Sequence, residues 1–139
     1  MAWKTSALVI ANRTVDSDQL QEALEQRARS GPVRFTLLVP CGPTGRDSAR
    51  ERLDAACERI RAAGLEVEGS LARDSEPLAA AHEAWDPAKY DEIVVCTLPT
   101  GASKWLQVDL PHRLQKLTDA PVTHVVAYER NPAAAESAI

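Results

Sequence analysis

The sequence predicts a doubly wound, Rossmann-like α/β domain built on a five-stranded parallel sheet. Short apolar runs alternate along the chain with segments whose apolar residues recur at helical spacing, in the order β-α-β-α-β-α-β-α-β. The links between these segments are short, which requires right-handed crossovers and therefore parallel strands. With 139 residues, the chain suits a single core. We expect one domain over residues 1–128 and a loose tail over 129–139.

The strands are predicted from apolar runs of strand length. Residues 7–11 form an unbroken apolar run, which is typical of a central strand covered on both faces. Residues 65–71 alternate between apolar and polar side chains, which predicts a half-exposed strand at an edge of the sheet. The five expected strands are 7–11, 33–39, 65–71, 93–96 and 122–127.

The first two helices are predicted from residues that typically cap a helix. Asp16 with Gln19, and Ser48 with Glu51, have the three-residue spacing of a capping box. Apolar residues follow each pair at helical spacing, and a glycine ends each segment. We therefore expect helices to begin just after Asp16 and Ser48.

The other two helices follow the third and fourth strands. Asp74 or Ser75 is expected to cap the third helix, with His82 and Trp85 on its inner face. Asp109 is expected to cap the fourth helix, whose buried face would carry Leu110, Leu114 and Leu117.

The composition excludes several classes of function. A net charge of −4 argues against a nucleic-acid-binding protein, which would carry an excess of basic residues. No apolar run approaches the ~20 residues of a membrane span. The three cysteines are odd in number and lack metal-ligand spacing, so we expect free thiols in a reducing cytoplasm.

A candidate ligand crevice lies where the strands end. In open α/β sheets, ligands bind outside the carboxyl ends of the strands. Positive charges after these ends predict either a pocket for a small anion or solvated loop charge, and solvated loop charge is the favoured interpretation because exposed charge needs no function. The glycine and serine after the fourth strand can offer N–H and hydroxyl groups to an anion, or simply form turns. The candidate residues are Asn12, Arg13, Pro40, Thr97, Gly101, Ser103 and Lys104.

No catalytic pattern is evident in the sequence, so we expect a non-enzymatic protein with no resident metal or cofactor. The chain lacks a G-x-S-x-G motif and a metal-ligand cluster. A phosphoacceptor receiver domain would need an acidic pair after the first strand, where this chain has Asn12 and Arg13. Cys96 is interpreted as a small core residue, and Trp105 as a lid over the sheet or a contact with a second subunit.

The first strand ends in a polar loop at Asn12, the second ends at Val39-Pro40, and the chain closes with the segment D-L-P-H-R-L-Q-K-L-T-D-A-P-V-T-H-V-V. In these features, residues 5–128 resemble the universal stress protein family. The resemblance implies the strand order 3-2-1-4-5. Nucleotide-binding members of the family carry G-x-x-G, nine residues, then G-[ST], where this chain has Pro99 and Val108-Asp109. We therefore predict no ATP binding tighter than about 100 μM, and disfavour ATP or AMP as a cofactor.

The last strand predicts a homodimer. Residues 122–128 are mostly apolar, and neither lysine nor proline discourages another strand from pairing with them. The resemblance implies dimerisation through this strand about a two-fold axis. The residues expected at the interface are Val122, His124, Val126 and Tyr128.

Overall fold

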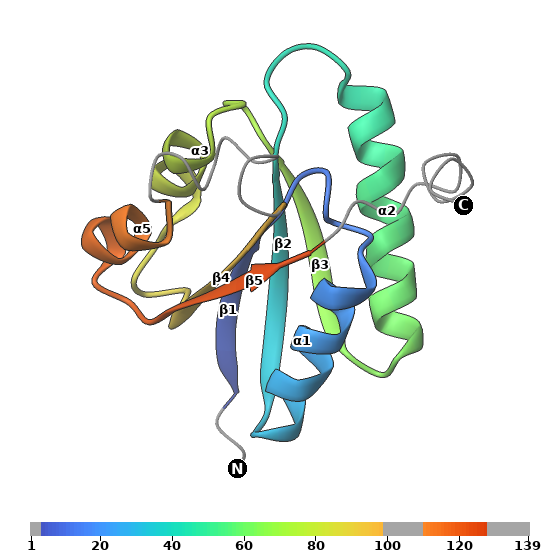
Figure 1. Cartoon of the computed structure of the whole chain (residues 1–139), viewed down its shortest axis with the longest axis vertical. Helices are drawn as coiled ribbons and strands as arrows, with labels where there is room; N and C mark the ends of the chain where they lie inside the picture. Colours follow the sequence, from blue (N-terminus) through green and yellow to red (C-terminus); the bar gives the residue numbers. More distant parts are fainter. Residues whose placement is uncertain (1–3, 99–109, 128–139) are drawn as a thin grey trace.

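A computed structural model describes residues 4–98 and 110–127, which form a central sheet with helices on both faces (Figure 1). The strands are β1 (Thr5–Ile10), β2 (Val33–Pro40), β3 (Glu66–Ala72), β4 (Glu92–Thr97) and β5 (Val122–Val126). The helices are α1 (Asp18–Arg29), α2 (Arg46–Ala62), α3 (Pro77–Ala84) and α5 (Leu110–Thr118). None of these helices is long and apolar enough to cross a membrane.

The sheet has the order β3-β2-β1-β4-β5, and every neighbouring pair of strands is parallel. This confirms the predicted fold class, with β1 at the centre and β3 at one edge. β1 hydrogen-bonds to β2 on one side and to β4 on the other. The direction of winding therefore reverses between β1 and β4, which makes this boundary the topological switch point of the sheet.

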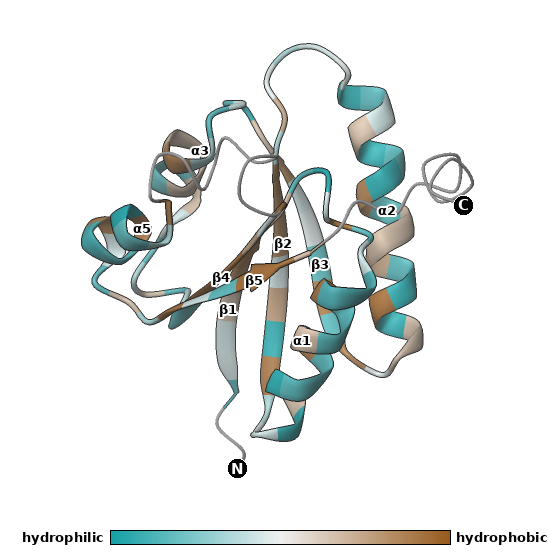
Figure 2. Cartoon of the chain, viewed as in Figure 1, coloured by the Kyte–Doolittle hydropathy of each residue, from teal (hydrophilic) through white to brown (hydrophobic). Residues whose placement is uncertain are grey.

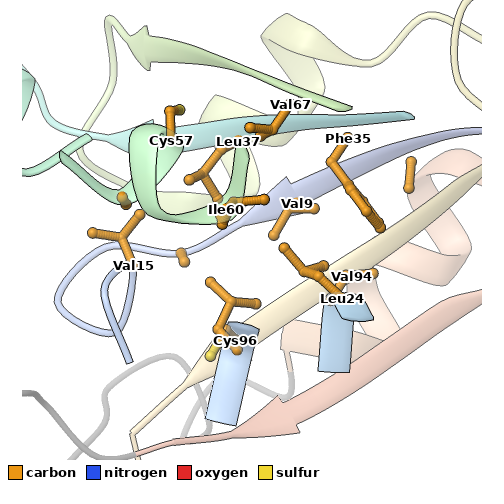
Figure 3. Packing of buried hydrophobic residues seen from close by; sticks show 14 of the residues in the cluster. Val9, Val15, Leu24, Phe35, Leu37, Cys57, Ile60, Val67, Val94 and Cys96 are labelled. Atoms are coloured by element: carbon orange, nitrogen blue, oxygen red, sulfur yellow. The ribbon is translucent and has the colours of Figure 1, made fainter. Parts of the chain in front are cut away.

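Each face of the sheet carries its own apolar cluster, because successive side chains of a strand point to opposite faces. On one face, Val9 and Phe35 pack with Leu24 of α1 and Ile60 of α2. Figure 3 shows several members of this cluster, among them Phe35, Leu24 and Val94. On the other face, a smaller cluster lies beneath α3 and α5, which contribute Ala80, Ala81, Leu110 and Leu114.

The beginnings of α1 and α2 differ from the prediction. Ser17 rather than Asp16 caps α1, and its hydroxyl accepts the Leu20 N–H at 3.1 Å. Helix α2 begins at Arg46, two residues before Ser48. Gly45 precedes it with a φ of 70°, a left-handed conformation that glycine adopts without steric cost.

Helix α3 also begins later and ends earlier than its sequence pattern indicates. Glu76 is the cap, accepting the Ala79 N–H at 2.8 Å, while the Asp74 carboxylate accepts the Glu76 N–H. His82 is exposed, so its predicted place on the inner face is wrong. Trp85 ends the helix in an extended conformation and stacks on Tyr90, with ring centroids 5.9 Å apart.

The short last helix is only partly as predicted. Leu110 and Leu114 are fully buried, whereas Leu117 is 39% exposed. Leu117, the third predicted core residue of α5, therefore lies at the margin of the apolar cluster beneath α3 and α5. The expected cap Asp109 and the tail over 129–139 lie outside the described residues.

Candidate functional site

The ends of β1 and β4 are held together at the switch point. The β1 loop, residues 11–16, follows β1, and the Thr14 hydroxyl donates a hydrogen bond to the Cys96 carbonyl oxygen at 3.3 Å. Thr14 is 2% exposed, so this bond is sheltered from water. In doubly wound sheets the crevice outside such a pair of strand ends is the usual ligand site.

Asn12 lies in this loop and is held by an arginine of α2. The Arg52 guanidinium donates to the Asn12 carbonyl oxygen at 3.3 Å and reaches the Asn12 side-chain oxygen at 3.5 Å. The loop thus lies between α2, which supplies Arg52, and β4, which accepts from Thr14 (Figure 1). Both contacts fix the position of Asn12 relative to the sheet.

The loop after β2 is fixed by Arg46. Its guanidinium donates to the carbonyl oxygens of Gly42 and Ala72, each at 3.0 Å. Arg46 therefore joins this loop to the end of β3. Pro40 is buried as the last residue of β2, opposite Ala72 of β3. The Arg46 guanidinium therefore stabilises the loop through these hydrogen bonds, and its positive charge also raises the local electrostatic potential.

Thr97 ends β4 and contacts the edge strand. Its hydroxyl lies 2.7 Å from Nε2 of His124, and its carbonyl oxygen accepts the Ala127 N–H at 2.8 Å. Desolvation of the His124 ring lowers its pKa below the ordinary value. The neutral imidazole is thereby favoured beside Thr97.

Cys96 is fully buried beneath the same strand end. Burial raises the pKa of its thiol, and hydrogen bonds with the Thr14 and Ser17 side chains oppose this only in part. A buried thiol held in its protonated form is a poor nucleophile. Cys41, Cys57 and Cys96 are all free. Among the described residues, no three potential metal ligands lie close enough together to hold an ion.

Comparison with known proteins gives a match only at the level of structure. No protein-family model matches the sequence, and no curated protein matches it. A universal stress protein solved in complex with cAMP superposes with a TM-score of 0.64. The match covers 92% of this chain and 100% of that chain, at 19% sequence identity.

The chain has the fold of the universal stress proteins. A universal stress protein from Archaeoglobus fulgidus matches with a TM-score of 0.58 and 22% identity, over 87% of this chain and 93% of that chain. The universal stress protein from the same organism in complex with dAMP matches with a TM-score of 0.56 and 21% identity, over 90% and 99%.

The universal stress protein fold brings together part of the predicted site. Asn12 follows β1, and Thr97 ends the adjacent strand β4. Arg13 is exposed in the β1 loop. Pro40 lies one strand away. The remaining candidates, Gly101, Ser103 and Lys104, lie outside the described residues, as do Pro99, Trp105, Val108 and Tyr128.

Two residues of the site were missed by the sequence analysis. Arg52 lies in the middle of α2, 40 residues from Asn12, and nothing in its immediate sequence distinguishes it from other arginines of that helix. Thr14 follows a strand end, and this position could have marked it as a residue that contacts a neighbouring strand.

Proposed function

We propose that this chain is a non-catalytic, cytoplasmic module of the universal stress protein type that binds a small phosphate-bearing ligand and forms a homodimer. The observation that carries the ligand proposal is the closure of the β1 and β4 ends by Thr14 and the Cys96 carbonyl at the switch point. This hydrogen bond holds the β1 loop in a fixed position beside the crevice. Two structures with the same fold contain nucleotides with a single phosphate, cAMP in one and dAMP in the other.

A monophosphate fits the sequence better than ATP. Pro99 has no N–H to offer, and the Asp109 carboxylate would repel a neighbouring phosphate by about 1–4 kcal/mol at close range. A triphosphate would need more donors from this segment than a monophosphate. We therefore expect AMP, dAMP or cAMP to bind in preference to ATP.

A thermal-shift panel tests the ligand proposal. The panel contains AMP, dAMP, cAMP, ATP and inorganic phosphate. A ligand present at 100 times its Kd stabilises the folded state by about 2.7 kcal/mol, which raises the Tm by several degrees. We expect this shift with at least one monophosphate and a smaller shift with ATP. If no compound moves the Tm at millimolar concentration, the crevice is not a nucleotide site.

The dimer proposal is supported by the edge strand β5. Val126 is 46% exposed, and Thr123 and His124 are also exposed. The outer edge of β5 leaves N–H and C=O groups available to a second strand. Antiparallel pairing with a second copy would satisfy these groups and cover Val126.

Light scattering at tens of micromolar tests the dimer. The wild-type chain should have twice the monomer mass, and Val126→Lys should be monomeric yet folded because this side chain is exposed. Ser70→Lys places the same charge on β3 at the opposite edge and should leave the dimer intact. A monomeric wild type would exclude the proposed dimer.

A further inference from the structure

We infer that two copies of β5 pair antiparallel about His124, and that protonation of the two facing histidines separates the subunits. This inference rests on the proposed dimer and adds its register and its regulation. The partner is a second copy of this chain. The argument has three parts, which concern the backbone of β5, its side chains and its charge.

The backbone of β5 directs alternate residues toward a second strand. The N–H and C=O groups of one strand residue point to the same side, and successive residues alternate between the two sides. The Pro121 carbonyl oxygen accepts the Ile93 N–H of β4 at 2.9 Å. At the other end, the Ala127 N–H donates to the Thr97 carbonyl oxygen of β4 at 2.8 Å. The odd-numbered residues therefore face β4. The strand residues that direct their N–H and C=O groups away from β4 are Val122, His124 and Val126.

These three residues determine the register of a symmetric pair. A two-fold axis at His124 places this residue opposite its own copy, and Val122 opposite Val126 of the partner subunit. Every outward N–H and C=O group of each strand then has a partner. An axis at Thr123 or at Val125 would instead leave one of the three outward residues beyond the end of the partner's strand.

The side chains of β5 suit the same register. Residues two apart lie on one face of the sheet, and Val122 packs on the cluster beneath α3 and α5. His124 is exposed beside it, and Val126 is 46% exposed. Pairing about His124 places a valine against a valine on both sides of the two imidazoles. At the opposite edge of the sheet, β3 carries Glu66 and Glu68, whose charges discourage such pairing.

The facing histidines make this pairing sensitive to protons. Residues that exchange both hydrogen bonds in an antiparallel pair have Cα atoms about 5.5 Å apart, and like charges directly opposite are destabilising. Desolvation already lowers the pKa of His124 in the single chain, and a partner strand would remove more water. The dimer thus binds fewer protons than two separate chains, so a falling pH favours the separate chains.

Among the described residues, no carboxylate offsets a charge on His124. Glu92 of β4 lies on the opposite face of the sheet, where it pairs with Arg27 of α1 at 2.7 Å. Asp119 is exposed in the connection before β5. Helix α5 has no acidic residue, and its titratable side chains are the exposed His112, Arg113 and Lys116. Desolvation is the cause of the lowered His124 pKa, without a contribution from any of these charges.

The dimer dissociation constant as a function of pH tests the control by protons. Sedimentation velocity gives this Kd for the wild type at several pH values between about 7.5 and 5.5, where histidine titrates. We expect the Kd to rise about tenfold or more as the pH falls. His124→Gln is neutral throughout and should change by less than about twofold over the same range. His112→Gln removes an exposed histidine of α5 and should retain the wild-type dependence.

Oxidative cross-linking tests the register. In a Cys41→Ser background, the remaining native thiols, Cys57 and Cys96, are buried. His124→Cys brings two thiols opposite each other, within the Cα distance of a disulfide. Thr123→Cys is equally exposed, but its copies lie diagonally, about 7–8 Å apart. We expect His124→Cys to form covalent dimers faster than Thr123→Cys.

The outcomes separate the inference from the proposed function. If cross-linking of Thr123→Cys is as fast as that of His124→Cys or faster, the register about His124 is wrong. A dimer whose Kd does not change with pH, or a His124→Gln variant that keeps the wild-type dependence, excludes control by His124. In each of these cases the dimer itself stands. A wild type that is monomeric at about pH 7.5 overturns the proposed dimer and the inference together.

Discussion

The two faces of the sheet differ in what covers them. On the face with α1 and α2, most of the side chains of the strands are apolar, and α2 alone has 17 residues. On the other face, α3 has only 8 residues, and the amino-terminal halves of the first three strands carry polar side chains. Figure 2 shows polar stretches within β2 and β3. These side chains are Ser6, Arg34, Thr36, Glu66 and Glu68, which line a groove of about 530 Å³.

This difference indicates where the stability of the fold resides. Hydrophobic stabilisation grows with the apolar area removed from water, so most of it belongs to the face with α1 and α2. The polar floor of the groove is held instead by exposed ion pairs, such as Lys4 with Glu66 at 2.8 Å. Exposed pairs of this kind contribute little to the free energy of unfolding.

Neighbouring residues of β2 give the largest expected contrast. Phe35 is 1% exposed on the α1 and α2 face, whereas Thr36 points to the groove and contacts Glu68 at 3.4 Å. Phe35→Ala should lower the free energy of unfolding by about 3–5 kcal/mol, and Thr36→Ala by about 1 kcal/mol. Urea denaturation measures both values. Similar losses for the two variants would show that the faces contribute equally.

A second pair of neighbours lies in β3. A Cβ atom at Gly69 would lie 2.8 Å from Cγ of Leu53 and 3.0 Å from the Cys57 sulfur, both on α2. Gly69→Ala should therefore cost about 1–3 kcal/mol through overpacking. Ser70→Ala, on the opposite face and exposed, should be nearly neutral. A neutral Gly69→Ala would mean that α2 shifts away from the sheet without cost.

The ion pair on the face with α1 and α2 should contribute more to the free energy of unfolding than the ion pair in the groove. Arg27 of α1 donates to Glu92 at 2.7 Å, and the two side chains are only 27% and 17% exposed. Glu92→Gln should lower the free energy of unfolding by about 1 kcal/mol, and this loss should persist at high salt because the pair is partly shielded. Lys4→Gln in the groove should have no measurable effect in chemical denaturation. A larger loss for Lys4→Gln would reverse the comparison.

The smallest expected effects depend on pH. The pKa of His124 is lowered in the folded state by desolvation, so the folded protein binds fewer protons than the unfolded chain. The stabilisation is complete above the unfolded value of 6.5 and is lost as the pH falls from there toward the lowered pKa. His124→Gln should remove this loss of stability, which melting curves recorded at a series of pH values below 6.5 would measure. An unchanged pH dependence in the variant would assign the effect to another group.

Glu66 should act in a separate, more acidic range. The hydrogen bond from Lys4 is the main cause that lowers the pKa of the Glu66 carboxyl. Its contribution is present above the unfolded value of 4.5 and disappears as the pH falls through the lowered pKa. Glu66→Gln should therefore lower the Tm slightly above about pH 4.5, where the carboxylate is charged, and make no difference below the lowered pKa. A difference between the variant and the wild type that persists at pH values below the lowered pKa would contradict this assignment.

The sequence predicted the architecture because apolar runs and helical spacing are local signals. The helix starts were less accurate. Asp16 and Ser17 are adjacent and are equally good caps, so the local sequence does not choose between them. The start of α2 depends on the left-handed Gly45 and on the contact between Arg46 and the Ala72 carbonyl, which only the folded chain creates. His82 was misplaced because α3 is short and Trp85 leaves the helix.

The candidate site was predictable only where it follows strand ends. Asn12 and Thr97 could be identified because parallel strands end at one edge of the sheet. Arg52 could not, because its contact with Asn12 depends on the packing of α2 against the sheet. In the same way, the sequence shows the positive charge of Arg46 after β2 but not the Gly42 and Ala72 carbonyl oxygens that accept its hydrogen bonds.

The boundary between β1 and β4, which we call the seam, has a consequence for the kinetics of folding. The strands β3, β2 and β1 are joined by local connections, whereas the hydrogen bond from the Ser6 N–H to Asp91 spans 85 residues and that from Thr14 to Cys96 spans 82. Closing so long a loop costs chain entropy before any contact compensates for it, and such closures slow folding. We therefore expect the candidate crevice, which lies on this seam, to form late in folding. A ligand bound there would slow unfolding by closing the seam, while leaving the rate of folding nearly unchanged.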